Sequence, residues 1–228
     1  MIDTFSTTEL YLIASSFNAK GLYGLPDKKQ FQLQGEKVFK EAHDRLIAKG
    51  FLTENGAFTN EGAFLVEVVW HYVVSKKYVQ CNNLMFAFGE ADADNVVMLI
   101  EMEEQTSYQV HLLEKPLALQ LLTKEFAVMR REPLADEKEF LMKELPAEEA
   151  AYIEKLGIPN DCLILDIVHK ADKPQTKASF WSWVVIIYEE KLIMFDLSKG
   201  SFHRTSQYYF MKMIFDAMDF PYRREEGA

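Results

Sequence analysis

The sequence has few of the residues on which several classes of function depend. Its two cysteines, Cys81 and Cys162, are too few for a disulfide framework or a four-ligand zinc site. Its ten glycines form no dense cluster that would build a phosphate-binding loop. Lysine and arginine number 25 against 35 aspartates and glutamates, and the formal charge of -10 opposes binding to nucleic acid or an anionic membrane. No secretion signal and no apolar run of about 20 residues occurs, so we expect a cytoplasmic protein that does not insert into a membrane. Because the ligand and loop motifs described above are missing, we also expect no metal and no cofactor.

Enough apolar material is present for a substantial core. Hydrophobic residues make up 49% of the sequence and aromatic residues 13%, which argues against a chain that is disordered overall. The charge is unevenly divided: residues 1–77 hold nine basic and nine acidic side chains, whereas residues 78–228 hold sixteen and twenty-six. The second part therefore carries all the excess acid, and we expect a partner of that part to be basic or neutral.

The first third of the chain, residues 1–77, is predicted to be helical. Ser6 and Glu9 have the spacing of a capping box, and an apolar helical face follows them. Two further patterns predict helices at about Glu36 to Lys49 and Asn60 to Lys77. The last of these has a broad apolar stripe, so we expect it to pack on the elements that follow it.

From Tyr78 onward the pattern changes to the alternation that is typical of strands. Three strands joined by short polar turns are predicted, and short turns favour antiparallel pairing because a parallel pair needs a long crossover. The second half of the chain then repeats the order of helix, three strands and helix. The predicted strands are residues 78–89, 95–103, 107–114, 161–170, 178–190 and 191–197, and the predicted helices are 117–128, 136–156 and 206–218.

This order predicts an α+β fold with an internal structural duplication. We expect a central antiparallel sheet of about six strands, flanked by helices and preceded by a helical, winged-helix-like segment. The predicted organisation is one compact domain overall. Its parts are the N-terminal helical segment (1–77), the first strand meander and helix (78–130), and the second helix, strands and helix (131–228).

Candidate catalytic and metal-binding residues are sparse. Glu67 and His71 lie one helical turn apart, but the second histidine of a zinc helix is missing, so a local ion pair is predicted. The segment 92–95 lacks the glycine and final glutamate of a calcium loop and is predicted to be an acidic turn. Cys81 and Cys162 lie near the starts of the two matching strand blocks. We expect them to be buried small hydrophobic residues, or, if a two-fold axis relates the halves, neighbours across it. We predict a protein without enzymatic activity; an enzyme with a pocket between the halves is one alternative.

A winged-helix regulator is the other alternative. Helix, turn and helix, followed by a turn at Asn55-Gly56 and another helix, resemble a winged helix and its wing. The second helix of this segment does not present a basic face to DNA, because acidic side chains are interspersed with the basic ones that would contact phosphate. The basic residues are Lys37, Lys40, Arg45 and Lys49, and the acidic ones are Glu36, Glu41 and Asp44.

The same segment supports a second comparison, through a few residues in the order of its elements. They are Leu10, Leu25-Pro26, Leu46, Gly50-Phe51-Leu52, Gly56 and Tyr78-Val79. In these residues and in this order the segment is similar to the N-terminal half of EspG, the cytoplasmic chaperone family of mycobacterial type VII (ESX) secretion systems. The similarity covers about residues 8–122, and the second half fits through the repeated order of helix, strands and helix. The chain also resembles proteins of about this size encoded in type VII secretion loci of Listeria and Bacillus relatives.

The resemblance implies a quasi-two-fold fold around a central sheet and a carrier that keeps a helical partner soluble before export. Because PE-PPE heterodimers are absent from such bacteria, the partner would be another helical secreted protein, such as an LXG toxin, or a secretion component. A second copy of this chain, in a homodimer, is an alternative partner. Aromatic and methionine side chains suit the recognition of helices because they adapt and bury large areas. The expected contact residues, in the loop 170–177, the strand 180–188 and the last helix, are Lys173, Gln175, Phe180, Trp181, Trp183, Tyr188, Tyr208, Tyr209 and Met211.

Overall fold

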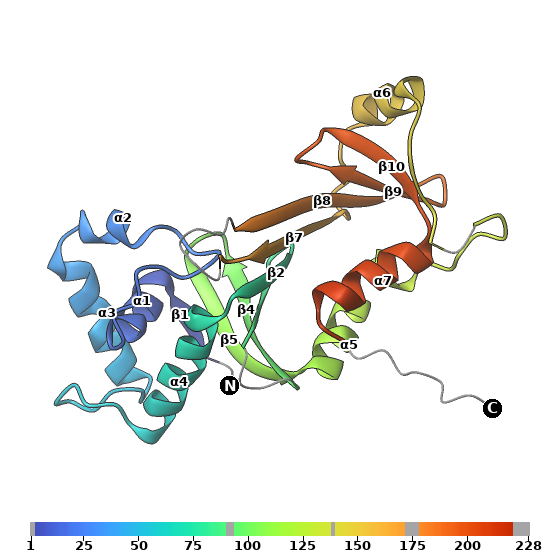
Figure 1. The fold of residues 1–228 in the computed structure, drawn as a ribbon. Coiled ribbons are helices and arrows are strands. Elements are labelled where there is room, and N and C mark those ends of the chain that lie inside the picture. The colour runs from blue at the N-terminus through green and yellow to red at the C-terminus, as the bar shows by residue number, and fades with distance from the viewer. Residues whose placement is uncertain (1–2, 90–93, 138–139, 172–177, 221–228) are drawn as a thin grey trace, which may run out of the picture. The chain divides into compact units, whose positions relative to one another are not determined.

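The computed structural model describes residues 3–89, 94–137, 140–171 and 178–220 (Figure 1). These residues form an α+β fold with seven α-helices and a large antiparallel sheet of ten strands. The prediction of about six strands was therefore wrong. In hydrogen-bonding order the strands are β1-β5-β4-β3-β2-β7-β8-β9-β10-β6. The chain divides into two compact units, Met1–Tyr78 with Asn83–Leu113 and Val79–Asn82 with Glu114–Ala228.

The first unit places four helices with the strands at one end of the sheet order. Pairing is antiparallel, with Phe5 of β1 opposite Tyr108 of β5 and Phe86 of β3 opposite Met98 of β4. All four of these side chains are buried, which shows that the core lies between the sheet and the helices. The elements are β1 (Thr4–Ser6), α1 (Thr7–Ser15), α2 (Lys28–Gln32), α3 (Glu36–Ala48), α4 (Asn60–Val74), β3 (Leu84–Phe88), β4 (Asn95–Glu103) and β5 (Ser107–Glu114), while β2 (Lys77–Cys81) contributes residues to both units.

The start of α1 confirms the predicted capping box. The Glu9 backbone N–H donates to the Ser6 hydroxyl at 3.3 Å, and the Ser6 backbone N–H donates to the Glu9 carboxylate at 2.6 Å. The Glu9 side chain is buried, and Lys49 at the end of α3 reaches its Oε1 atom at 2.7 Å. The cap therefore also joins α1 to α3, which the sequence pattern did not predict.

The second unit is a sheet with helices on both faces. In Figure 1, α6 lies on one side of β8, β9 and β10, and α7 lies on the other side. Under α6, Ile153 packs with Val184, Ile186 and Ile193 of the sheet. The elements are α5 (Lys115–Glu125), a 3-10 helix (Ala127–Arg130), β6 (Met142–Glu144), α6 (Ala147–Leu156), β7 (Leu163–His169), β8 (Ser179–Tyr188), β9 (Lys191–Asp196), β10 (Ser201–Thr205) and α7 (Gln207–Ala217).

Differences from the predicted elements have local causes. Residues 78–89 were predicted as one strand, but Asn82 adopts a positive φ of 52° and the chain turns there, which separates β2 from β3. The helix predicted at 136–156 begins only at Ala147, directly after Pro146, and β6 lies ahead of it. The short strands β1, β6 and β10 carry too few residues for an alternating pattern to be recognised. By contrast, β4 and β5 have the predicted bounds.

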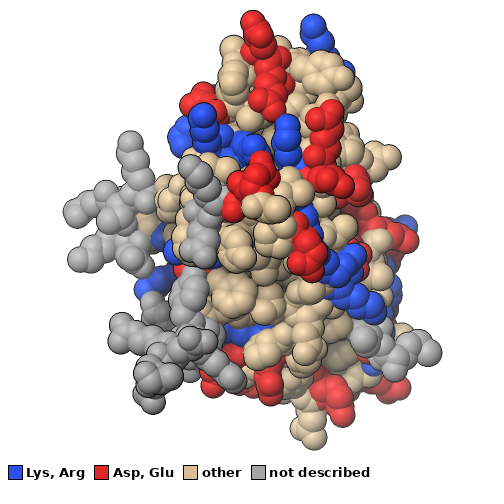
Figure 2. Space-filling model, turned by 90° about the vertical axis from the view of Figure 1, so that its right-hand side faces the viewer, with Lys and Arg blue, Asp and Glu red and all other residues tan. Residues whose placement is uncertain are grey.

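The surface mixes charges of both signs. On the face drawn in Figure 2, Lys and Arg side chains are interspersed with Asp and Glu around an area that carries no charged side chains. The net acidity of residues 78–228 is therefore not gathered into one patch on this face. None of the helices in the described residues is long and apolar enough to cross a membrane.

Candidate functional site

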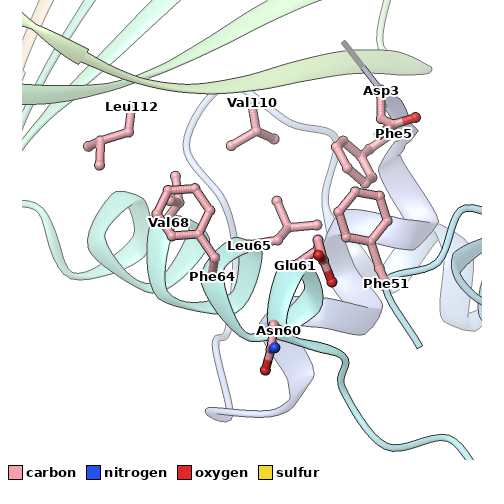
Figure 3. Close-up of a pocket in the computed structure, with 10 residues that line it drawn as sticks. All are labelled: Asp3, Phe5, Phe51, Asn60, Glu61, Phe64, Leu65, Val68, Val110 and Leu112. Atoms are coloured by element: carbon pink, nitrogen blue, oxygen red, sulfur yellow. The ribbon is translucent and has the colours of Figure 1, made fainter. Parts of the chain in front are cut away.

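A cavity of about 450 Å³ lies in the first unit between α4 and β5 (Figure 3). Val110 and Leu112 point from β5 toward the helix, and Phe64 and Leu65 point from α4 toward the strand. Val68 also lines the cavity from α4. We call this feature the α4–β5 groove; Phe5 and Phe51 close one of its ends.

The groove continues along α4 into a second cavity of about 140 Å³. The two cavities share Phe64, Val68 and Leu112. Glu67 and His71, further along α4, line only the second cavity. Because α-helical residues rise about 1.5 Å each, the lining positions from residue 60 to residue 71 span about 16 Å of the helix axis.

The closed end of the groove depends on a tight contact between α4 and the segment before it. Phe5 and Phe51 pack with their ring centroids 5.1 Å apart. Thr59 caps α4 by accepting from the Gly62 N–H at 3.1 Å, and its own N–H donates to the Phe51 carbonyl at 3.2 Å. Residue 62 has no space for a side chain, because a Cβ atom would lie 2.0 Å from that carbonyl oxygen. The glycine therefore lets α4 lie against Phe51.

Helix α4 has the composition of a helix that is buried on all sides. Only Asn60, Glu61, Glu67 and His71 of its fifteen residues are polar. Nevertheless its apolar side chains extend beyond the face that packs on the unit. The exposed fractions are 57% for Phe64, 43% for Trp70 and 46% for Val74. Of these three side chains, Phe64 lines both cavities of the groove.

Three carboxylates are found among the described residues that line the groove and its continuation. Asp3 lies on the strand side and Glu61 on the helix side of the same end (Figure 3). Glu67 lines the continuation, where its carboxylate is 4.0 Å from His71, as predicted for a local pair. Among the described residues that line either cavity, none is lysine or arginine. The nearby Lys49 is engaged with Glu9 and lies over the Phe5 ring.

The contact residues predicted from the sequence lie in the second unit. Phe180, Trp181 and Tyr208 are exposed, whereas Trp183 is buried and packs against His203. The others are partly buried: Tyr188, Tyr209 and Met211. Lys173 and Gln175 lie outside the described residues. Trp183 therefore belongs to the core of its unit and does not form an exposed surface with the other aromatic residues.

The second unit has a smaller cavity of about 260 Å³ under α6. Ile153 and Ile158 line one side, and Val184 and Ile186 of β8 line another. The two exposed residues Phe180 and Trp181 are not part of it. Some of the aromatic residues predicted as contacts are therefore exposed in this unit, but the structure does not place them at this cavity.

The cysteines are both free. Cys81 is buried in β2, and Cys162 is partly buried just before β7. Asn82, next to Cys81, donates from its side chain to the Cys162 carbonyl at 3.1 Å and accepts from the Ile164 N–H at 2.6 Å. Burial raises the pKa of the Cys81 thiol to about 12, so it remains protonated at neutral pH. In the described part of the chain, no group of three His, Cys, Asp or Glu residues is placed to hold a metal ion.

The winged-helix-like segment lies beside the groove. A short hairpin pairs Leu52 with Phe58, and Gly56 turns it with a φ of 77°. The predicted turn at Asn55-Gly56 is confirmed. On α3, Lys37 forms an exposed ion pair with Glu41 at 3.8 Å, so part of its positive charge is neutralised within the helix.

Sequence comparison assigns a family without assigning an activity. Residues 1–226 match the family model described as a domain of unknown function, DUF5081. No curated protein matches the chain. The function must therefore be argued from the groove and its charges.

Proposed function

We propose that this chain, which belongs to the DUF5081 family, is an adaptor or chaperone that binds a helix of another protein in the α4–β5 groove. The observation that carries the proposal is the apolar groove beside a helix whose apolar side chains remain exposed. Binding of an amphipathic helix in an apolar groove is a common mode of peptide recognition. No catalytic group is required for this function.

The exposed part of Phe64 supplies a usable amount of binding energy. An aromatic side chain presents about 200 Å² of surface, of which about 110 Å² remains open at the observed exposure of 57%. At about 25 cal/mol per Å², covering that area contributes at most about 3 kcal/mol, and the cost of ordering both partners reduces the part that appears as affinity. Leu112, 43% exposed on the opposite wall, adds to this surface.

The setting that we propose is the cytoplasmic side of a type VII secretion system. It rests on the resemblance of residues 8–122 to EspG, whose quasi-two-fold arrangement we extend to this chain as part of the proposal. The partner would be a helical secreted protein or another component of the system. A second copy of this chain is the competing occupant, and the oligomeric state of the purified protein distinguishes it.

The test is co-purification of the tagged chain with each product of its neighbouring genes. We expect one helical product to be retained, and the Phe64→Ser variant to retain it at least ten-fold less. Leu33→Ser is the matched control, because Leu33 is an even more exposed apolar residue, outside the groove. Retention of no neighbour by the native chain, or equal retention by both variants, would count against binding in the groove.

A winged-helix regulator is the second candidate, favoured by the hairpin that follows α3. Binding to DNA would require α3 to approach phosphates with Glu36, Glu41 and Asp44 on the same helix. Fluorescence anisotropy with duplex DNA at low salt tests it. A salt-sensitive rise in anisotropy would support this candidate, and a flat titration would remove it.

A further inference from the structure

We propose that the α4–β5 groove selects a basic amphipathic helix, in which apolar anchors fill the groove and flanking lysine or arginine side chains meet its acidic rim. This inference rests on the proposed function and adds the chemistry of the partner. It follows from the position of three carboxylates, those of Asp3, Glu61 and Glu67, along the apolar groove. We call these three residues the acidic rim. An uncharged groove would bind apolar helices without regard to their charge.

The carboxylates are placed at both walls and along the length of the groove. Asp3 and Glu61 stand on opposite sides of one end (Figure 3), and Glu67 follows Glu61 by six residues of α4. Six residues correspond to about 9 Å along a helix axis. A partner helix lying along the groove therefore meets acidic side chains at positions that are separated by nearly two of its own turns.

The groove is long enough for a short helix and not for a large one. Its lining along α4 spans about 16 Å, which is about three helical turns. Within that length a partner presents apolar anchors at positions i, i+4 and i+7, which cover about 10 Å. Phe64 and Leu112, which line both cavities, stand where these anchors pass between the walls.

The rim distinguishes partners by charge more than it tightens binding. Exposed ion pairs contribute little individually. Two or three pairs gained with a basic helix, and the same number of repulsions with an acidic one, together give a preference of about ten-fold or more at moderate salt. This preference falls as salt rises, because exposed charges are screened beyond about 8 Å at physiological ionic strength.

The experiment uses two synthetic helical peptides of about 14 residues, Ala-rich, with Leu at i, i+4 and i+7. One carries Lys at the flanking positions and the other carries Glu. Titration against the full chain by calorimetry should show at least a ten-fold preference for the Lys peptide. The Glu61→Gln/Glu67→Gln double variant should reduce this preference several-fold. A Pro within the Lys peptide should abolish binding, because the helix is required.

The matched control is Glu36→Gln/Glu41→Gln, which removes the same charge from exposed positions on α3. Equal loss of preference in both double variants would overturn a local rim and indicate general attraction. Equal affinity for the two peptides, no binding of either, or unimpaired binding of the Pro peptide would also overturn the inference. The proposed function has a separate readout, since dependence of a co-purified partner on Phe64 would survive any of these results.

Discussion

Replacing Gly62 by alanine tests the close contact that forms the end of the groove. Alanine is favoured over glycine inside a helix by about 1 kcal/mol, so a helix free of neighbours would gain stability. Here the new Cβ would lie 2.0 Å from the Phe51 carbonyl oxygen and 3.0 Å from its carbonyl carbon. Overpacking costs about 1–3 kcal/mol, and we take the upper end because a backbone atom must move. The expected net loss is about 2 kcal/mol.

The assay is thermal or urea unfolding followed by far-ultraviolet circular dichroism. For a chain of this size, about 2 kcal/mol lowers Tm by about 4–8 °C. Gly21→Ala is the control, because a Cβ at that glycine meets nothing within 4 Å, and we expect its stability to be unchanged or slightly raised. An unfolding midpoint of Gly62→Ala at or above that of the native chain would refute the reasoning. Displacement of Phe51 should also weaken binding of a partner in the groove.

Two further predictions concern titratable groups in the second unit. Because burial, followed by the charge of Asp166, raises the pKa of Cys81 to about 12, a thiol reagent should modify partly buried Cys162 in the native protein and Cys81 only on unfolding; equal rates by mass spectrometry would contradict this. Burial raises the pKa of Asp196, but hydrogen bonds from Ser198 and Lys199 outweigh it and hold that pKa below its usual value. The stability that this ionised carboxylate contributes is present above its unfolded-state pKa and is lost as pH falls through its folded-state pKa. Asp196→Asn should therefore flatten the acid side of a plot of Tm against pH. An unaltered acid side would argue against a contribution of Asp196 to stability.

The acidic composition has a more specific consequence than exclusion of nucleic acid. The sequence assigned the excess acid to residues 78–228 and predicted that a partner would meet it there. The groove instead takes Asp3, Glu61 and Glu67 from the part of the chain that is neutral overall. The net charge of a segment therefore did not locate the acidic rim, because a rim depends on which few carboxylates the fold brings to one place.

Local signals in the sequence were enough for many elements. Ser6 and Glu9 specify their capping box within four residues. The strands β4 and β5 follow from their β-branched and aromatic content between short polar turns, to which β5 adds alternation. The break at Asn82 was missed because asparagine is tolerated both in a strand and in a left-handed turn. The strand β10 was missed because its five residues are recognisable only through pairing with β9 and β6.

The sequence by itself determined that the segment from about Asn60 to Lys77 contains a helix with a broad apolar stripe along its surface, since that pattern can be recognised in consecutive residues. Only the tertiary structure decided which of that surface stays open. The walls of the groove come from α4 and from Val110 and Leu112, more than thirty residues beyond its end, while Phe5 and Phe51 close it from the other side. Strand pairing and helix packing bring these segments together, and no local pattern in the sequence encodes such non-local contacts.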